Sequence, residues 1–345
     1  MKALVKYEKG RHKVRLMECE APHAGAGQVR IKVAYAGICG TDLHIYEEDG
    51  GYKNDPPVIL GHELSGIVDE VGPGCKEELL GKAVVSETYF ITCGKCFFCK
   101  TGRKNLCAQR KSIGSGVNGA MAEYIVVPAD NIHLIPEGIG LKEAAMTEPM
   151  ACCAQAVLEK GNVIAGSRVL ITGPGAIGLM CMQFAVQCGG RVLVAGTEKD
   201  AKRLELAKSL GAEAVAYSDR PDSMKTLMSM LGENGADIVF ECSGAGAAIN
   251  MGLELVRKGG RFVQVGLTGK STTLDMNLIT LKELELFGTF AQKPVWWTRC
   301  LELVEQGKVT AAPLIEEPMP LERWKEAFEG FASGTGMKYM LDLSL

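Results

Sequence analysis

Residues 168–187, RVLITGPGAIGLMCMQFAVQ, decide the fold of the second half of the chain. The pattern predicts a buried strand over Arg168–Thr172 and a helix over Ala176–Gln187, joined by the turn Gly173-Pro174-Gly175-Ala176-Ile177-Gly178. The turn matches G-x-G-x-x-G in its required context of strand, turn and helix. The first glycine allows the tight turn, the second lets a pyrophosphate approach the backbone, and the third lets helix and strand pack closely.

This turn predicts a dinucleotide site, since the free N–H groups at a helix N-terminus attract phosphate. Glu198 follows Gly178 by 20 residues, where a carboxylate accepts hydrogen bonds from ribose hydroxyls and repels a 2′-phosphate. We therefore expect NAD, although Lys199 and Arg203 could hold the phosphate of NADP. A glycine turn without a ligand is the alternative. The expected cofactor contacts are Gly173, Gly175, Ala176, Ile177, Gly178, Glu198, Arg203, Val265, Gly266 and Leu267.

The pattern on either side changes character near residue 150. Before it, β-branched runs alternate with glycine-rich turns, which is typical of a folded-over β-barrel. After it, strands alternate with helices, which predicts βαβ units and a doubly wound parallel sheet of the α/β class. The runs that support this are Val29–Ala36, Leu64–Val71 and Ala83–Thr88 before the change, Arg191–Ala195, Asp200–Leu210, Asp237–Glu241, Ala247–Val256 and Arg261–Val265 after it, and Trp297–Gln306 and Met337–Leu343 near the end.

Bulk composition limits the class of protein. A length of 345 residues predicts two domains, and a formal net charge of −3 argues against a nucleic-acid or membrane partner. No signal peptide is visible at the N-terminus, and glycines and Pro174 interrupt the uncharged stretch 169–190, which argues against a membrane span. Thirteen cysteines in so large a chain predict a reducing compartment, and hence the cytoplasm, rather than a disulfide scaffold.

Four cysteines, Cys93, Cys96, Cys99 and Cys107, lie within 15 residues in the spacing C-x2-C-x2-C-x7-C. Four thiolates fill a tetrahedral zinc shell and leave no position for substrate, so we expect a structural zinc. Two disulfides would conflict with a reducing compartment. A nucleic-acid zinc ribbon, which the nearby Lys95, Lys100, Arg103 and Lys104 would suit, would conflict with the acidic balance.

Cys39, His62 and Glu63 are candidates for a second metal site. They are separated in sequence, and Gly40 and Gly61 flank them. One thiolate, one imidazole and one carboxylate leave a fourth zinc position open, which catalysis requires. A lone cysteine or histidine is more often structural, so the residues by themselves make this site a candidate only.

Several ordered motifs resemble those of medium-chain zinc-dependent alcohol dehydrogenases, in particular their polyol and threonine dehydrogenase branch. Gly37-Ile38-Cys39-Gly40-Thr41-Asp42-Leu43-His44 resembles the GICGTDxH motif, and Gly61-His62-Glu63 resembles GHE. Ala122-Glu123-Tyr124 resembles the end of G-x-F-A-E-Y, and Thr147-Glu148-Pro149 resembles the start of the cofactor domain in polyol-type members. With the four cysteines and the glycine turn, the resemblance covers the whole chain.

The resemblance implies a role for each matching residue. Cys39, His62 and Glu63 would hold a catalytic zinc, with Glu148 beside it as an alternative ligand or proton-transfer group. Thr41 and His44 would carry the alcohol proton to solvent. The alternatives are a surface histidine at position 44 and a structurally paired carboxylate at position 148.

The resemblance also implies the domains: a GroES-like catalytic barrel over residues 1–150, a Rossmann NAD-binding domain over 151–292 and a return to the catalytic domain over 293–345. Substrate would bind between the domains. The protein would be a homodimer or homotetramer.

The substrate is less sharply indicated. Met121 and Gln155-Ala156-Val157 depart from common family patterns, and the motifs divide between threonine and polyol dehydrogenases. We expect a polyol or related secondary alcohol, with threonine or a bulkier alcohol such as a hydroxysteroid as alternatives. Met121, Phe290, Trp296 and Trp297 could line an apolar pocket for the bulkier substrate or could simply be core or interface residues.

Two other functional classes compete. A zinc-free reductase of quinones or enones should lack the set of Cys39, His62 and Glu63. A non-catalytic NAD-binding regulatory protein could keep the fold, because fold does not imply function. The open metal site, the proton-relay candidates and the dinucleotide motif together argue against both.

Overall fold

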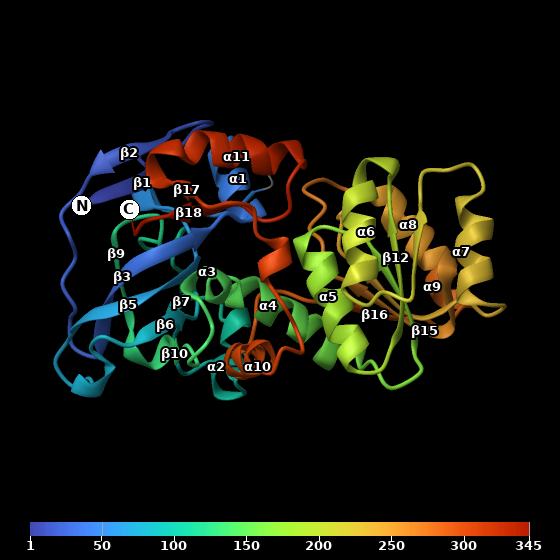
Figure 1. Ribbon diagram of the computed structural model, residues 1–345, viewed down its shortest axis with the longest axis horizontal. Helices are drawn as coiled ribbons and strands as arrows, with labels where there is room; N and C mark the ends of the chain where they lie inside the picture. The colour runs from blue at the N-terminus through green and yellow to red at the C-terminus, as the bar shows by residue number, and fades with distance from the viewer. Residues whose placement is uncertain (50, 345) are drawn as a thin grey trace. The chain divides into compact units, whose positions relative to one another are not determined.

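The computed structural model describes residues 1–49 and 51–344 and divides into two compact units (Figure 1). The first consists of Met1–Pro149 and Gln292–Leu345, and the second of Met150–Ala291. No helix in the described part of the chain combines the length and apolarity that a membrane crossing needs.

The first unit is built mainly from antiparallel strands. A three-stranded sheet has the order β2 (Val14–Glu18), β1 (Lys2–Lys6), β4 (Val58–Ile59). A seven-stranded sheet has the order β10 (Ile132–Leu134), β6 (Ala83–Ser86), β5 (Glu63–Val71), β3 (Gln28–Gly37), β18 (Met340–Asp342), β17 (Met319–Pro320), with β9 (Tyr124–Pro128) also paired to β3. A third pair is β7 (Tyr89–Ile91) with β8 (Lys111–Ser112).

Helices and short turns connect these strands. The helices are α1 (Gly40–Glu47), α2 (Phe97–Lys100), α3 (Leu141–Ala144), α4 (Thr147–Ala154), which runs into the second unit, α10 (Pro294–Glu305) and α11 (Trp324–Ser333). The 3-10 turns are η1 (Glu77–Leu79), η2 (Lys104–Leu106), η3 (Ala129–Asn131), η6 (Ala312–Leu314) and η7 (Leu321–Arg323).

One apolar core joins the two larger sheets of this unit. Leu4 from β1 and Val14 from β2 belong to the same buried cluster as Ile31 from β3 and Leu64 from β5. The C-terminal segment completes this core, because Leu341 of β18 is fully buried in it and pairs with Ala36 of β3. The end of the chain is therefore part of the sheet that holds its beginning.

The second unit contains one six-stranded parallel sheet. Its order is β13 (Ala214–Tyr217), β12 (Arg191–Gly196), β11 (Arg168–Thr172), β14 (Ala236–Glu241), β15 (Val256–Gln264), β16 (Glu285–Gly288). This is the 3-2-1-4-5-6 order of doubly wound dinucleotide-binding folds. The helical segments are η4 (a π-helix, Gln155–Gly161), α5 (Ala176–Gln187), η5 (Glu198–Asp200), α6 (Ala201–Ser209), α7 (Ser223–Leu231), α8 (Gly246–Leu255) and α9 (Met276–Leu281).

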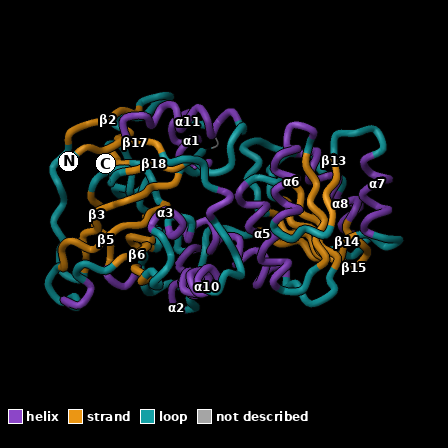
Figure 2. The backbone as a smooth tube through the Cα atoms, in the orientation of Figure 1, coloured by secondary structure: helices purple, strands orange, loops and turns teal. Residues whose placement is uncertain are grey.

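Helices cover both faces of this sheet. Figure 2 shows α5 and α6 on one side of the strands and α7 and α8 on the other. The arrangement follows from right-handed crossovers, because the strand order reverses direction at β11. The α/β fold class predicted from the sequence is confirmed for this unit.

Several predicted boundaries need correction. The run Ala83–Thr88 ends as a strand at Ser86, and Met337–Leu343 is a strand only over Met340–Asp342. The helix expected near Trp297–Gln306 begins earlier, at Pro294, because proline suits the first turn of a helix. The strand expected over Arg261–Val265 begins at Val256, with a register shift in its pairing to β14.

Phe240 is a sensitive position in the core of the second unit. It is fully buried in β14, and a Cβ atom on Gly161 would lie 2.2 Å from its ring. We expect Phe240→Ala to lower the free energy of unfolding of this unit by about 3–5 kcal/mol, since the cavity cannot close. Urea unfolding followed by circular dichroism measures the loss. Met230→Ala, at a residue 47% exposed, serves as control, and an equal loss in both variants would contradict the prediction.

Candidate functional site

Three candidate metal ligands meet in the first unit although they come from separate segments. Cys39 follows β3 and caps α1, His62 precedes β5, and Glu63 is the first residue of β5. The antiparallel register places Glu63 opposite Gly37, two residues before Cys39. The ligand atoms of the three residues all lie within 4.8 Å of one another. One sulfur, one imidazole nitrogen and one carboxylate oxygen at this separation fit a zinc ion with an open fourth position.

Asp42, which the sequence analysis did not single out, holds two of these segments together. Its carboxylate accepts hydrogen bonds from the backbone N–H of Cys39 at 2.9 Å and of Gly61 at 3.2 Å. The side chain is fully buried, and Oδ1 lies 3.9 Å from Nδ1 of His62. Burial raises the pKa of Asp42, while His62 and the Cys39 N–H oppose the shift. The signal for this residue was its place three positions after Cys39, as in a capping box.

Lys338 is a second functional candidate that sequence reasoning missed. Its ammonium donates to Glu63 Oε1 at 2.6 Å and to the Ile38 carbonyl at 2.8 Å. Burial works to lower its pKa, but Glu63 and Cys39 outweigh burial and raise that pKa above its ordinary value. The metal-ligand candidates thus share their environment with a buried cation.

Glu148 lies at the start of α4 and is nearly buried. Burial is the main cause that raises the pKa of its carboxyl to about 7. The charge of Glu63 adds to this increase, and the charge of His62 opposes it. Gln292 donates to Glu148 Oε1 at 3.2 Å. Such a carboxyl can gain and lose a proton near neutral pH, as proton transfer requires.

Thr41 and His44 both lie on α1, whose N-terminus is capped by Cys39. His44 is partly exposed, with Nδ1 2.5 Å from Asp49 Oδ1 and its ring stacked on Tyr52 at 4.7 Å. Asp49 was not predicted. It fixes the orientation of the imidazole and leaves the other ring nitrogen for a further partner.

The four predicted cysteines form a separate cluster in the first unit. The sulfur atoms of Cys93, Cys96, Cys99 and Cys107 lie within 4.8 Å of one another. Sulfurs of Cys93 and Cys99 are 3.9 Å apart, far beyond a disulfide bond, and no disulfide joins any of the described cysteines. The arrangement fits a closed tetrahedral zinc site.

Backbone N–H groups support the sulfurs of this cluster. The N–H of Cys96 points to Cys93 Sγ at 3.3 Å, and that of Cys93 points to Cys107 Sγ at 3.4 Å. Hydrogen bonds from Lys95 and Cys96 lower the pKa of Cys93 to about 6. Thiolate is the form that binds metal, so these N–H groups favour the metal-binding form of Cys93, whereas burial and the neighbouring thiols raise the pKa of Cys99 to about 11.

The glycine turn of the second unit has the geometry that its sequence predicts. Gly173 adopts φ +89°, and a Cβ on Gly178 would lie 2.0 Å from the Gly173 carbonyl oxygen. A Cβ on Gly175, which caps α5, would meet no atom within 4 Å. The turn thus leaves open space at a helix N-terminus beside the carboxyl end of β11, where doubly wound sheets bind ligands.

Glu241, another residue that was not predicted, organises the neighbouring loop. It is fully buried at the end of β14 and accepts the N–H groups of Ser243 at 2.8 Å and Gly244 at 3.1 Å. Gln264 at the end of β15 donates to it at 2.6 Å. A Cβ on Gly173 would meet Ser243 at 2.7 Å, so this loop packs directly against the glycine turn.

Of the remaining predicted cofactor residues, Glu198 and residues 265–267 follow strands of the same sheet, whereas Arg203 lies in α6. Glu198 follows β12, is exposed, and pairs with Arg220 at 3.1 Å, while Arg203 pairs with Asp200 at 3.1 Å. Val265, Gly266 and Leu267 follow β15, and both Val265 and Gly266 donate their N–H to the Glu241 carbonyl.

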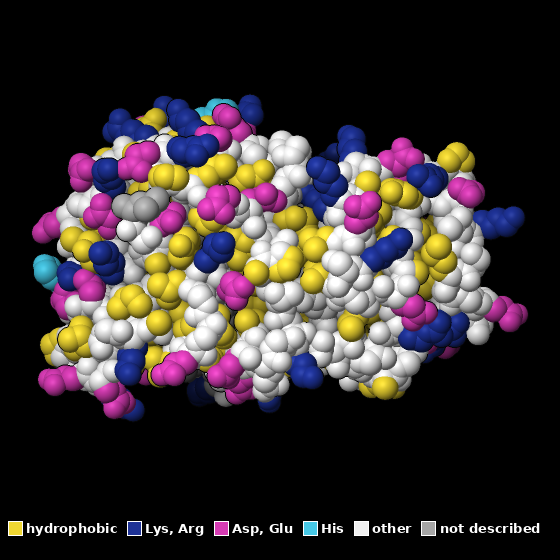
Figure 3. Space-filling model, viewed as in Figure 1, with side chains coloured by type: hydrophobic (Ala, Val, Ile, Leu, Met, Phe, Trp, Pro, Cys, Tyr) yellow, Lys and Arg dark blue, Asp and Glu magenta, His cyan; other side chains and the backbone are white. Residues whose placement is uncertain are grey.

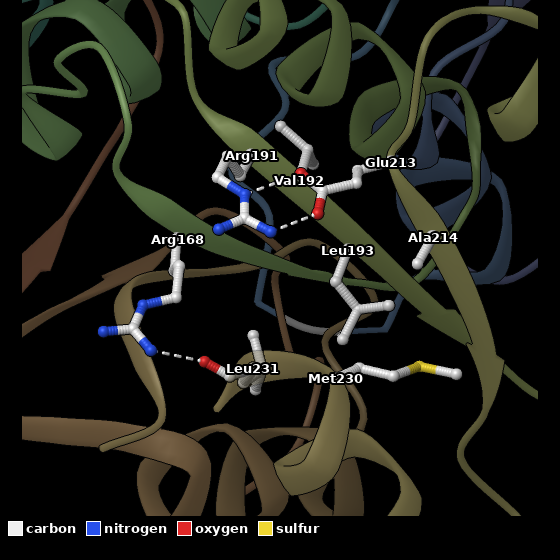
Figure 4. A pocket seen from close by; sticks show the side chains of 8 residues that line it. All are labelled: Arg168, Arg191, Val192, Leu193, Glu213, Ala214, Met230 and Leu231. Carbon is white, nitrogen blue, oxygen red and sulfur yellow. Dashed lines mark hydrogen bonds and ion pairs between the residues drawn. The ribbon is translucent and has the colours of Figure 1, made fainter. Parts of the chain in front are cut away.

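A concave site at the amino ends of the strands of this sheet is less suited to a ligand than the glycine turn at their carboxyl ends (Figure 4). Arg168 and Arg191 stand at the first positions of β11 and β12. Arg191 pairs with Glu213 at 2.6 Å, and Arg168 donates to the Leu231 carbonyl at 2.8 Å. Both cations already have partners at the amino ends of the strands, so we regard this site as structural.

Two residues proposed for an apolar substrate pocket are core residues. Met121 is fully buried in the core of the first unit, and a Cβ on Gly61 would lie 2.6 Å from its side chain. Trp297 is buried and stacks on His133 at 5.7 Å. On the face shown in Figure 3, Lys and Arg side chains are interspersed with Asp and Glu, as the mixed composition predicts.

Comparison with known proteins identifies the family. Residues 25–137 match the model of the alcohol dehydrogenase GroES-like domain, and residues 176–306 match that of the zinc-binding dehydrogenases. D-arabitol-phosphate dehydrogenase of Enterococcus avium is 40% identical, over 99% of this chain and 97% of its own. Sorbitol dehydrogenase of Halalkalibacterium halodurans is 38% identical, over 99% of each chain.

A solved structure agrees with these relatives. Galactitol-1-phosphate dehydrogenase from Escherichia coli superimposes with a TM-score of 0.89 at 28% identity, covering 99% of this chain and 100% of that one. The predicted GroES-like and doubly wound fold is therefore confirmed. The chain belongs to the zinc-binding alcohol dehydrogenase family and is an oxidoreductase acting on CH–OH groups.

Proposed function

We propose that this protein is a zinc- and NAD-dependent dehydrogenase that interconverts a polyol, or a related secondary alcohol, with its ketone. The observation that carries the proposal is the convergence of Cys39, His62 and Glu63 within 4.8 Å, with Glu148 in the same unit. Relatives named for arabitol phosphate and sorbitol support the polyol class over a hydroxysteroid, and threonine is the second candidate substrate because threonine dehydrogenases are up to 37% identical to this chain. The buried Met121 and Trp297 also weaken the argument for a large apolar substrate.

Each candidate residue has a distinct task in this proposal. Cys39, His62 and Glu63 would hold one zinc, and Cys93, Cys96, Cys99 and Cys107 would hold a structural zinc. When bound, zinc supplies Lewis-acid polarisation of an alcohol oxygen and NAD supplies a hydride acceptor. Thr41 and His44 pass the hydroxyl proton toward solvent, with His44 oriented by Asp49. Glu148, whose pKa burial raises to about 7, exchanges protons or serves as an alternative ligand.

The Met150–Ala291 unit binds NAD in this proposal. The open turn at Gly175 receives the pyrophosphate, and the Glu198 carboxylate accepts hydrogen bonds from the ribose hydroxyls. Support comes from the parallel strand order and from the steric role of Gly178. We further propose a reducing compartment such as the cytoplasm, because thirteen cysteines in a chain of this size, four of them clustered as metal ligands would be, do not suit a disulfide scaffold.

The first experiment is a substrate screen with a metal control. Zinc-replete enzyme should reduce NAD with a polyol or polyol phosphate and should be weaker with threonine, simple secondary alcohols and hydroxysteroids. Cys39→Ser should lower kcat/KM by at least about a thousandfold, roughly 4 kcal/mol, because a thiolate ligand is lost. It should also reduce the zinc content from two ions per chain to one. Full activity in Cys39→Ser would refute the catalytic zinc site.

Cofactor choice provides a second test. The Glu198 carboxylate, which lies beside Arg220, should repel the 2′-phosphate of NADP. Its removal in Glu198→Ala should therefore raise the ratio of kcat/KM for NADP over NAD about tenfold or more, roughly 1.4 kcal/mol. Glu213→Ala is the control, because Glu213 also pairs with an exposed arginine but lies at the amino ends of the strands, away from the glycine turn. An unchanged ratio in Glu198→Ala would show that this carboxylate does not select the cofactor.

We also propose that two copies associate through the edge strand β16. Within the described residues β16 pairs with β15, and Leu286 on it is 43% exposed. Met276 and Leu281 of the adjacent α9 are 63% and 76% exposed. An exposed apolar edge strand has backbone N–H and C=O groups that can pair with another chain. In a two-fold dimer, the β16 strands of two copies would pair with each other and each would supply the partner groups of the other.

Light scattering coupled to size exclusion tests this association. The protein should elute with at least twice the mass of one chain, 36.9 kDa. Leu286→Glu places a charge on the edge and should shift the distribution toward monomer, whereas Leu80→Glu, at an exposed leucine of the other unit, should not. A monomeric wild type would contradict the proposal.

A further inference from the structure

The buried ammonium of Lys338 lies among the candidate zinc ligands and has no place in the proposed chemistry. It donates to Glu63 Oε1 at 2.6 Å and also contacts Oε2. A third contact, at 2.8 Å, goes to the carbonyl of Ile38, the residue before Cys39. The lysine thus touches one candidate ligand directly and is one residue away from another.

The sheet builds this contact through long-range pairing. Glu63 of β5 lies opposite Gly37 of β3, and Gly37 lies opposite Met340 of β18, two residues after Lys338. The N–H of Ile38 donates to the Tyr339 carbonyl at 3.0 Å. The C-terminal segment is therefore bonded to the backbone that carries Cys39.

Gly37 provides the space in which the two side chains meet. A Cβ atom there would lie 2.1 Å from Glu63 Oε2 and 3.1 Å from Lys338 Cε. Any side chain at position 37 would displace the carboxylate or the lysine. The pair thus occupies a gap in the middle of the sheet, which restricts how the carboxylate can turn.

We propose that Lys338 is a positioning residue for the metal: it fixes the Glu63 carboxylate and the backbone at Ile38, so that Glu63 and Cys39 present their ligand atoms together. The proposal rests on the proposed function, in which both residues bind zinc. Residues that orient metal ligands typically contribute about 10–100-fold to metal affinity. If the lysine only neutralised a buried carboxylate, its removal would change stability and would leave metal affinity unaltered or raise it, because a nearby cation competes with the metal for that carboxylate.

Lys6 offers a matched control in the same unit. It is also fully buried, and it bonds the carbonyls of Gly10 and Ile45 and the carboxylate of Glu48. None of these partners is a candidate ligand. Lys6→Met therefore removes a buried, paired ammonium without removing an orienting contact to the proposed zinc site.

The experiment measures metal binding rather than turnover. Wild type, Lys338→Met and Lys6→Met are compared in the full-length protein by zinc competition against a chromophoric chelator and by the absorption spectrum after cobalt exchange. We expect Lys338→Met to bind metal about 10–100-fold more weakly at the three-ligand site, with an altered cobalt spectrum there. The four-cysteine site should be unchanged, and Lys6→Met should keep wild-type affinity and spectrum. Unchanged or tighter binding in Lys338→Met would overturn the proposal.

A double-mutant cycle keeps the test decisive if Lys338→Met folds poorly. Glu63→Gln with Lys338→Met removes both buried charges, and its zinc affinity is compared with that of Glu63→Gln. If Lys338 acts mainly through Glu63, the two should agree within about threefold. A further loss of tenfold or more would show that the lysine acts mainly through the Ile38 carbonyl, and it would overturn the proposed role of Lys338 in fixing the Glu63 carboxylate. If the wild type binds only one zinc, the proposed function itself fails, so the two failures are distinguishable.

Discussion

The hydrogen bonds of the buried Asp42 carboxylate are the contacts on which the candidate site depends. They join the N–H of Cys39, after β3, to that of Gly61, before β5. Because these hydrogen bonds come from backbone N–H groups, they hold the two segments together whatever the orientation of the Cys39 and His62 side chains. Leaving these buried N–H groups without an acceptor would cost about 1–3 kcal/mol each. The site is thus organised by contacts that a metal does not need to supply.

The two cysteine-containing sites are built on different scales. The four-cysteine cluster lies within one loop of 15 residues, where local turns and short helices set the spacing. The site of Cys39, His62 and Glu63 depends on the register between β3 and β5, and Lys338 reaches it from the other end of the chain. A local cluster can form around its own metal, whereas the other site requires the folded sheet.

This difference of scale explains what the sequence could predict. Arg168–Thr172 and Ala176–Gln187 were predicted with the boundaries that the structure has, because apolar pattern and glycines encode them locally. The short β13 and β16 were missed, since four-residue strands carry little pattern, and the nine-residue helix α7 was missed as well. The cysteine spacing and the family motifs named residues that do come together.

Asp42, Lys338 and Glu241 escaped prediction for one physical reason: a charged residue in a sequence does not reveal whether it will be buried. Asp42 and Glu241 use the same device in different units, each a fully buried carboxylate that accepts backbone N–H groups of a functional loop. Only tertiary structure supplies the donors that make such burial favourable. The loops that we propose to hold metal or phosphate are therefore fixed by residues outside the proposed ligand set. Side chains that take no part in this support can then set substrate preference, since one fold can carry different functions.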